Sequence, residues 1–122
     1  MKKSNYKSGK LAEIFAKIIL FFKGYKIITS NFVTGRGTHA GEIDIIAQKS
    51  NIIVFIEVKK RTSLEDAAYS IKNQQKQRII NGAKSFIKQL DSNKNHNFRF
   101  DAFLFDKKFK FKHIKNAWEL DF

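Results

Sequence analysis

The chain has 122 residues, of which 43% are hydrophobic, and this composition excludes an intrinsically disordered protein. It contains no cysteine, which excludes disulfide bonds and cysteine-ligated zinc sites. Its 24 lysines and arginines outnumber 11 acidic residues, and the net charge of +13 favours a polyanionic partner such as nucleic acid. The length and the lack of an internal repeat predict a single domain, residues 1–122.

The N-terminal segment predicts an amphipathic helix over residues 9–23, ended by Gly24. Its expected core stripe consists of Leu11, Ile14, Phe15, Ile18, Ile19 and Phe22. Glu13 and Lys17 interrupt the apolar region and argue against a signal peptide, and the apolar run 18–22 is too short to span a bilayer. We therefore expect a soluble, cytoplasmic protein that does not contact membranes.

The hydrophobic patterns further along the chain predict an α/β protein. Residues 25–32 form a predicted strand, which is followed by a polar, glycine-containing loop and a hairpin over residues 42–60. A helical pattern covers residues 63–90. Two further strands, 98–105 and 109–114, are separated by a cationic turn. This order of elements predicts a mixed central β-sheet flanked by helices.

The hairpin carries charged residues within strands that are otherwise apolar. If residues 50–51 form the turn, Asp44 faces Glu57 across the two strands. In the same register, Glu42 faces Lys59 on the same side of the sheet, because side chains alternate along a strand. Two facing carboxylates repel each other unless a cation lies between them, and Mg²⁺ typically binds one or two carboxylates together with substrate phosphates. The alternative is an ordinary set of exposed cross-strand ion pairs.

The spacing of these residues resembles a known nuclease motif. Asp44, twelve residues, and then Glu57-Val58-Lys59 is similar to the PD-(D/E)xK motif. The wider stretch GEIDIIA…VFIEVKKR resembles the YraN-like proteins, an uncharacterised bacterial family related to archaeal Holliday-junction resolvases. The resemblance covers most of the chain and implies a restriction-endonuclease-like core. It also implies an endodeoxyribonuclease that depends on Mg²⁺ or Mn²⁺ and acts on DNA, including branched DNA, as a homodimer.

The resemblance implies roles for individual residues. Asp44 and Glu57 resemble the metal ligands, and Lys59 resembles the catalytic lysine. Glu13 resembles an acid that the first helix contributes, and Gln77 is expected near the scissile phosphate. The cations that we expect to contact nucleic acid are Arg36, Lys60, Arg61, Lys76 and Arg78.

Two other functions fit the sequence. A protein of the same fold could bind nucleic acid without cutting it, as an accessory factor in recombination or repair. The N-terminal helix could instead bind an anionic membrane surface, but we expect its apolar stripe to be needed in the core.

Two weaker features lie outside the hairpin. The three histidines, His39, His96 and His113, lack the spacing of a metal site, and we expect them at the surface or in loops. A basic edge near the C-terminus consists of Lys107, Lys108, Lys110, Lys112 and Lys115. It alternates with Phe109 and Phe111, which we expect to pack in the core.

Overall fold

The computed structural model describes residues 2–37, 40–91 and 94–119, with side chains from Lys7 onward. The elements are, in chain order, α1 (Lys2–Phe22), β1 (Lys26–Thr34), β2 (Gly41–Lys49), β3 (Ile52–Lys60), α2 (Leu64–Tyr69), α3 (Asn73–Lys88), β4 (Asn97–Phe105) and β5 (Phe111–Trp118). Among the histidines of the sequence, His39 lies outside the described residues.

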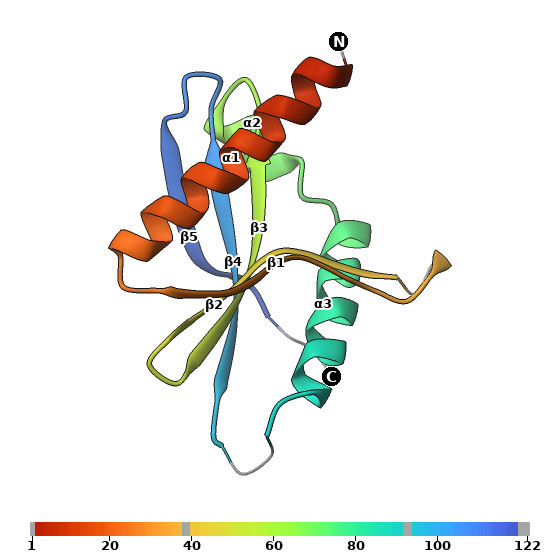
Figure 1. Ribbon diagram of the computed structural model, residues 1–122. Helices are drawn as coiled ribbons and strands as arrows, with labels where there is room; N and C mark the ends of the chain where they lie inside the picture. The colour runs from red at the N-terminus through yellow and green to blue at the C-terminus, as the bar shows by residue number, and fades with distance from the viewer. Residues whose placement is uncertain (1, 38–39, 92–93, 120–122) are drawn as a thin grey trace.

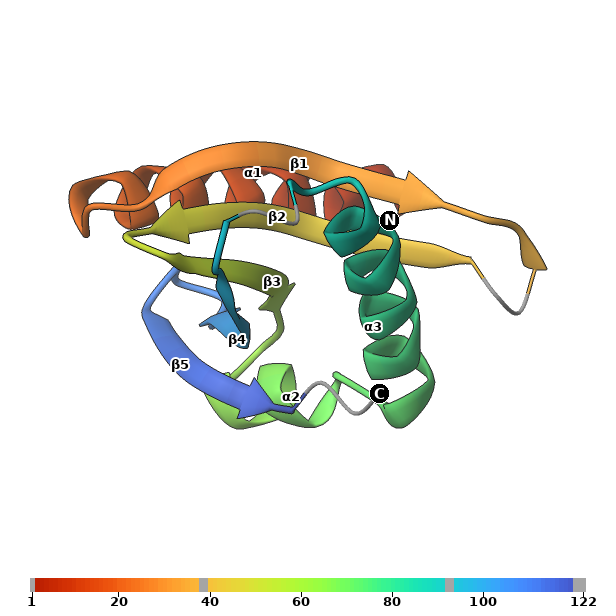
Figure 2. The ribbon, with the colours of Figure 1, turned by 90° about the horizontal axis from the view of Figure 1, so that it is seen from below.

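The five strands form one sheet in the order β1-β2-β3-β4-β5. Strands β3 and β4 are parallel, whereas the other neighbours are antiparallel. Helix α1 covers one face of the sheet, and α2 and α3 cover the other (Figures 1 and 2). This mixed sheet flanked by helices confirms the predicted α/β class with a restriction-endonuclease-like core.

The predicted register of the β2–β3 hairpin is confirmed. The pairs run from Ile45 opposite Ile56 to Lys49 opposite Ile52. The paired register ends at Ile45 opposite Ile56, so the predicted pairs of Asp44 with Glu57 and of Glu42 with Lys59 lie beyond it. Glu42 instead forms an ion pair with α3, in which its Oε2 lies 3.1 Å from Arg78 Nη2. The two strands diverge beyond Ile45, which opens a space at this end of the hairpin.

The expected core stripe of α1 is largely wrong. The residues of α1 that are buried against the sheet are Ala12, Ala16 and Leu20, with Phe15 and Ile19 half-buried beside them. The other four members of the expected stripe, Leu11, Ile14, Ile18 and Phe22, are exposed. The small side chains at positions 12 and 16 let α1 lie close to the sheet. The sheet therefore buries only a narrow strip of the helix surface.

The predicted helix over residues 63–90 is two helices, α2 and α3. Ala67 and Ile71 pack with residues of β4, whereas Ile79 and Ala83 pack with residues of β2 and β3. These strands lie at different positions across a twisted sheet, and one straight helix cannot cover both. The break follows Ser70, whose hydroxyl donates a 2.7 Å hydrogen bond to the Ala67 carbonyl. No glycine or proline marks it in the sequence.

A buried charge network ties β5 to β4. The Asp101 carboxylate is fully buried and accepts hydrogen bonds from Arg99 Nε and Nη2, both at 2.8 Å, and from the Asn116 amide at 3.0 Å. His113 Nε2 lies 2.7 Å from the same carboxylate, so this histidine is buried and not at the surface as expected. Burial raises the pKa of Asp101, but the bonds from His113 and Arg99 outweigh it and hold the pKa below its usual value.

Candidate active site

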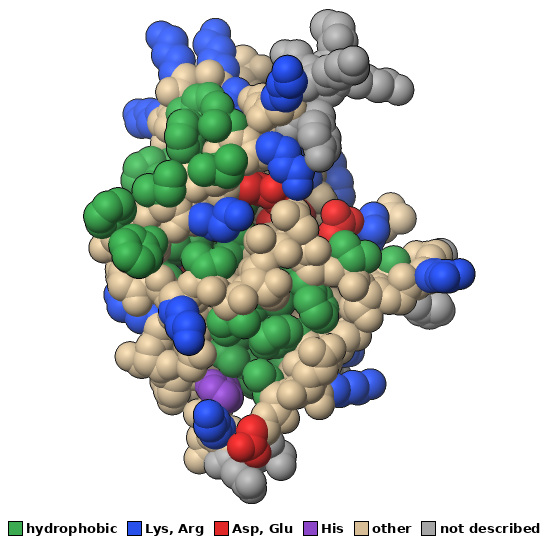
Figure 3. Space-filling view, in the orientation of Figure 1, with side chains coloured by type: hydrophobic (Ala, Val, Ile, Leu, Met, Phe, Trp, Pro, Cys, Tyr) green, Lys and Arg blue, Asp and Glu red, His purple; other side chains and the backbone are tan. Residues whose placement is uncertain are grey.

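A cleft of about 830 Å³ lies where α1, β2 and β3 meet, and α3 and the β4–β5 turn contribute to its rim. Four acidic residues line it: Glu13 from α1, Glu42 and Asp44 from β2, and Glu57 from β3. Figure 3 shows acidic side chains gathered beside α1, with lysines and arginines around them. The cleft therefore combines an acidic floor with a basic rim.

The divergence of β2 and β3 positions the central acids. Asp44 Oδ2 accepts a 2.8 Å hydrogen bond from the backbone amide of Val58, which fixes the carboxylate across the gap between the strands. Glu57 is only 5% exposed. Lys59 lies two residues further along β3 and so on the same face, with its Nζ 4.0 Å from Glu57 Oε2. The expected grouping of Asp44, Glu57 and Lys59 is present.

Two carboxyl groups in the cleft, those of Glu57 and Glu13, have raised pKa values. Burial, a hydrogen bond to the Asp44 carboxyl group and the charge of Asp44 raise the pKa of Glu57 far above its usual range, although Lys59 opposes the shift. Burial and the charge of Asp44 also raise the pKa of Glu13, whose carboxylate lies 3.6 Å from Lys10 Nζ. A cation among these groups would relieve both effects.

Two of the acids, Asp44 and Glu57, are suited to bind one hard divalent cation together. Within the described parts of the chain, no three acidic or histidine side chains are grouped closely enough to form a complete metal cage. Asp44 and Glu57 share a hydrogen bond, and Mg²⁺ characteristically takes one or two carboxylates and completes its coordination with water and substrate phosphates. The donor set is therefore suited to a cation that is completed by the substrate.

The basic residues expected at the site divide into two groups. Lys60, Arg61 and Arg78 line the cleft. Arg36 lies instead near the tip of the arm formed by β1 and β2, which extends beyond the body of the molecule (Figure 1). Lys76 does not line the cleft and places its Nζ 5.8 Å from the centre of the Trp118 ring.

Gln77 is also outside the cleft lining, and its side chain donates a 3.0 Å hydrogen bond to Asn81 Oδ1. Gln75 lines the cleft in its place. The signal that could have identified it is helical spacing, because Gln75 and Arg78 are three residues apart and lie on the same side of α3. Lys10, Asn31 and Lys107 also line the cleft, and Lys107 belongs to the basic edge that the sequence indicated near the C-terminus.

Comparison with known proteins places the chain in a family. A family model described as "Uncharacterised protein family UPF0102" matches residues 12–105, a segment that includes all of Glu13, Asp44, Glu57, Lys59 and Gln75. The chain belongs to the UPF0102 family. This membership confirms the resemblance to the YraN-like proteins.

Individual UPF0102 proteins match over most of their length. The UPF0102 protein of Nitrobacter winogradskyi is 37% identical over 98% of this chain and 98% of its own. That of Paramagnetospirillum magneticum is 36% identical over 93% of this chain and 88% of its own. A UPF0102 protein of Bradyrhizobium sp. (strain BTAi1) is 41% identical over 81% of this chain and 70% of its own. The names of these relatives specify no activity.

Proposed function

We propose that this UPF0102 protein is a metal-dependent nuclease that hydrolyses phosphodiester bonds in DNA. The observation that carries the proposal is a pair of carboxyl groups, the buried Glu57 and the half-buried Asp44, at the floor of an open cleft beside Lys59. A fold does not need such a pair for stability, and perturbed carboxyl groups in a cleft are typical of functional sites.

Asp44 and Glu57 would hold the cation, which as Mg²⁺ or Mn²⁺ supplies Lewis-acid stabilisation of the phosphate and lowers the pKa of a bound water. Lys59 supplies a positive charge for the developing oxyanion. Its side chain is only 15% exposed, so the ammonium is already positioned and needs little reorganisation during the reaction. The raised pKa of Glu13 brings this carboxyl group closer to the range in which it can exchange a proton at neutral pH.

The rim of the cleft suits a polyanionic chain. Its cations come from α1, the end of β3, α3 and the β4–β5 turn: Lys10, Lys60, Arg61, Arg78 and Lys107. Because they approach the acids from several sides, a nucleic-acid strand crossing the cleft would meet a cation on either side of the scissile phosphate. Its phosphates would compete with Glu42 for Arg78, and this exposed ion pair is easily exchanged.

Cleavage assays test the proposal. Labelled linear and branched DNA are incubated with Mg²⁺ or Mn²⁺ and with wild type, Asp44→Asn or Lys59→Met. We expect each substitution to lower the cleavage rate by about 100-fold or more, because each removes a charge at the reacting phosphate. Lys88→Met is the matched control, since Lys88 is an exposed cation at the end of α3, and it should cut like wild type.

A non-cutting DNA-binding protein is the second candidate, and the cationic rim of the cleft favours it, because the rim can bind a polyanion without any reaction. It predicts that wild type, Asp44→Asn and Lys59→Met all leave DNA intact while binding it in a salt-dependent manner. That result would contradict the nuclease proposal and leave the binding function in place.

A further inference from the structure

The side of α1 that faces away from the sheet is apolar. Its large side chains are Leu11, Ile14, Ile18, Phe21 and Phe22, which are 41%, 47%, 48%, 66% and 82% exposed. Successive helix residues are about 100° apart, so these side chains form one stripe opposite Ala12 and Ala16, and we name this stripe the α1 outer face. Figure 3 shows it as a continuous hydrophobic area along α1.

The α1 outer face is larger than a folded domain ordinarily exposes. Five large side chains with these exposed fractions present roughly 500 Å² of apolar surface, which is at the upper end for a monomer and typical of an interaction site. The domain core does not need this surface, because Ala12, Ala16 and Leu20 already fill the contact with the sheet.

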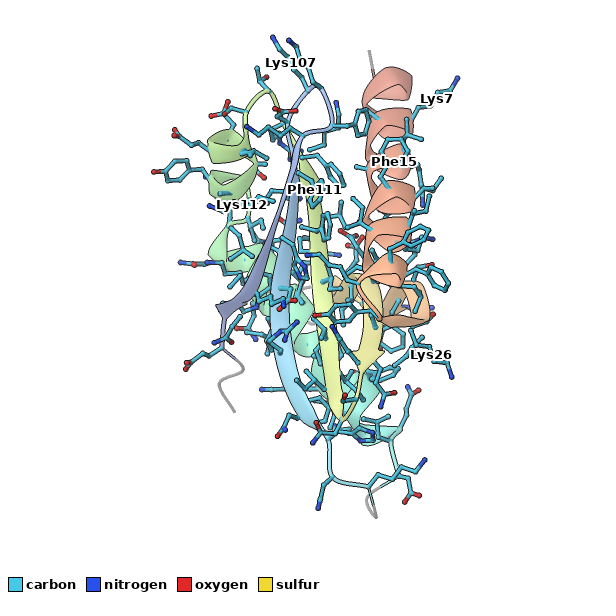
Figure 4. The ribbon with its side chains drawn as sticks, turned by 90° about the vertical axis from the view of Figure 1, so that its left-hand side faces the viewer. Lys7, Phe15, Lys26, Lys107, Phe111 and Lys112 are labelled. Atoms are coloured by element: carbon cyan, nitrogen blue, oxygen red, sulfur yellow. The ribbon has the colours of Figure 1, made fainter. Side chains whose placement is uncertain are left out.

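The surroundings of the α1 outer face are cationic. Glu13 is the only acid in the α1 sequence, and it lines the cleft. Lys7 and Lys26 project outward near the two ends of the helix, and Lys107 extends from the β4–β5 turn (Figure 4). All three lysines are exposed. A partner for this surface must therefore be apolar in its interior and negative at its edge.

We propose that the α1 outer face docks the protein on an anionic lipid bilayer. Leucine, isoleucine and phenylalanine on one side of a helix, with lysines along its borders, are suited to the boundary between headgroups and acyl chains. The lysines gain electrostatic attraction from anionic headgroups. No helix among the described residues is long and apolar enough to cross a bilayer, so the contact would be at the membrane surface.

Charge complementarity selects this occupant over the others. A second copy would bring the same lysines toward one another and pair two chains of net charge +13. Nucleic acid would satisfy the lysines and could stack bases on the two phenyl rings, but it offers no apolar partner to Leu11, Ile14 and Ile18. A bilayer with anionic headgroups satisfies both the cations and the apolar side chains, and this inference does not depend on nuclease activity.

Vesicle flotation tests the inference with the full chain. Vesicles of phosphatidylglycerol and phosphatidylcholine are compared with vesicles of phosphatidylcholine alone, at low salt and at about 1 M salt, where the Debye length is about 3 Å. The variant Phe21→Ser/Phe22→Ser removes apolar contact without changing charge. Tyr69→Ser is the matched control, because Tyr69 is a 75% exposed aromatic residue on α2.

We expect wild type and Tyr69→Ser to bind the anionic vesicles and to retain part of this binding at high salt. The double variant should bind at least about tenfold more weakly, since two phenyl rings no longer enter the lipid. Equal binding by wild type and the double variant would overturn the inference, because charge alone would then explain the association. A wild-type dimer that the double variant dissociates would also overturn it, by showing that a second copy covers the α1 outer face.

Discussion

Glu57 illustrates at the residue scale how a site can oppose stability. Its pKa is raised in the folded protein above the value of about 4.3 for an unperturbed glutamate. At a pH between the unfolded and the folded pKa, Glu57 keeps a proton in the folded state that it has lost in the unfolded state. The contribution of Glu57 to stability is therefore complete below about pH 4 and decreases as the pH rises toward the folded pKa.

Glu57→Gln should stabilise the metal-free protein at neutral pH. The amide keeps the shape of the side chain and can donate a hydrogen bond to Asp44, but it never has to carry a buried charge. We expect the free energy of unfolding at about pH 8 to rise by more than about 1 kcal/mol and to depend less on pH than in wild type. Urea denaturation at several pH values measures this, and a destabilised Glu57→Gln protein would contradict the account.

Asp101 has the opposite behaviour. Its pKa is lowered in the folded state, so its stabilising contribution is complete above its unfolded value of about 3.9 and is lost as the pH falls through the folded pKa. Asp101→Asn leaves the Arg99 guanidinium without its buried counter-charge and removes the carboxylate that His113 contacts, and we expect a loss of about 3 kcal/mol at neutral pH. Thermal melts measure the loss, with the exposed Glu65→Gln as a control that should be near neutral. Equal melting of Asp101→Asn and wild type would show that the network contributes nothing.

At the scale of elements, the position of α3 depends on a close approach between two backbones. A Cβ atom added at Gly41 of β2 would lie 2.5 Å from the Cα atom of Gly82 in α3, well inside van der Waals contact. A Cβ atom at Gly82 would lie 3.0 Å from the Ile43 side chain and 3.3 Å from the backbone nitrogen of Glu42, and these contacts are less close than those at Gly41. This contact fixes the helix that carries Gln75 and Arg78 to the cleft.

Gly41→Ala should therefore be far more damaging than Gly82→Ala. We expect Gly41→Ala to lower the free energy of unfolding by about 2 kcal/mol or more, because the backbone of β2 or α3 must move to make room for the methyl group. The second should change it by less than about 1 kcal/mol, since the alanine improves helix propensity while it crowds Ile43. Denaturation of both variants measures the difference, and equal effects would show that the two backbones are not held this closely.

The sequence predicted some elements and not others for physical reasons. The β2–β3 register follows from local alternation and a two-residue turn, and it was predicted correctly from the turn as far as Ile45 and Ile56. The break between α2 and α3 depends on how each helix packs on the twisted sheet, and no local feature of the sequence indicates it. The core side of α1 could not be chosen because apolar residues occur almost all around the helix, and the fold uses the side with the small Ala12 and Ala16.

At the scale of the whole molecule, the site joins residues that are far apart in the chain. Asp44, Glu57 and Lys59 could be grouped from the sequence because one hairpin carries them. Glu13 was expected only through the resemblance to a family, since its position depends on how α1 crosses the sheet. Gln75 was missed for a similar reason, because the rotation of α3 about its axis is set by its packing on β2.

Metal binding tests most directly whether β2 and β3 bring Asp44 and Glu57 together as one metal site. Mn²⁺ is titrated calorimetrically into metal-free wild type and into Asp44→Asn, in two buffers of different ionisation enthalpy. We expect wild type to bind Mn²⁺ with release of up to about one proton, because Glu57 must lose its proton to become a ligand. Asp44→Asn should bind more than about 100-fold more weakly, since even residues that only orient a ligand contribute about 10- to 100-fold. Equal affinity of the two proteins, or no binding by wild type, would contradict the assignment of Asp44 and Glu57 as a metal site.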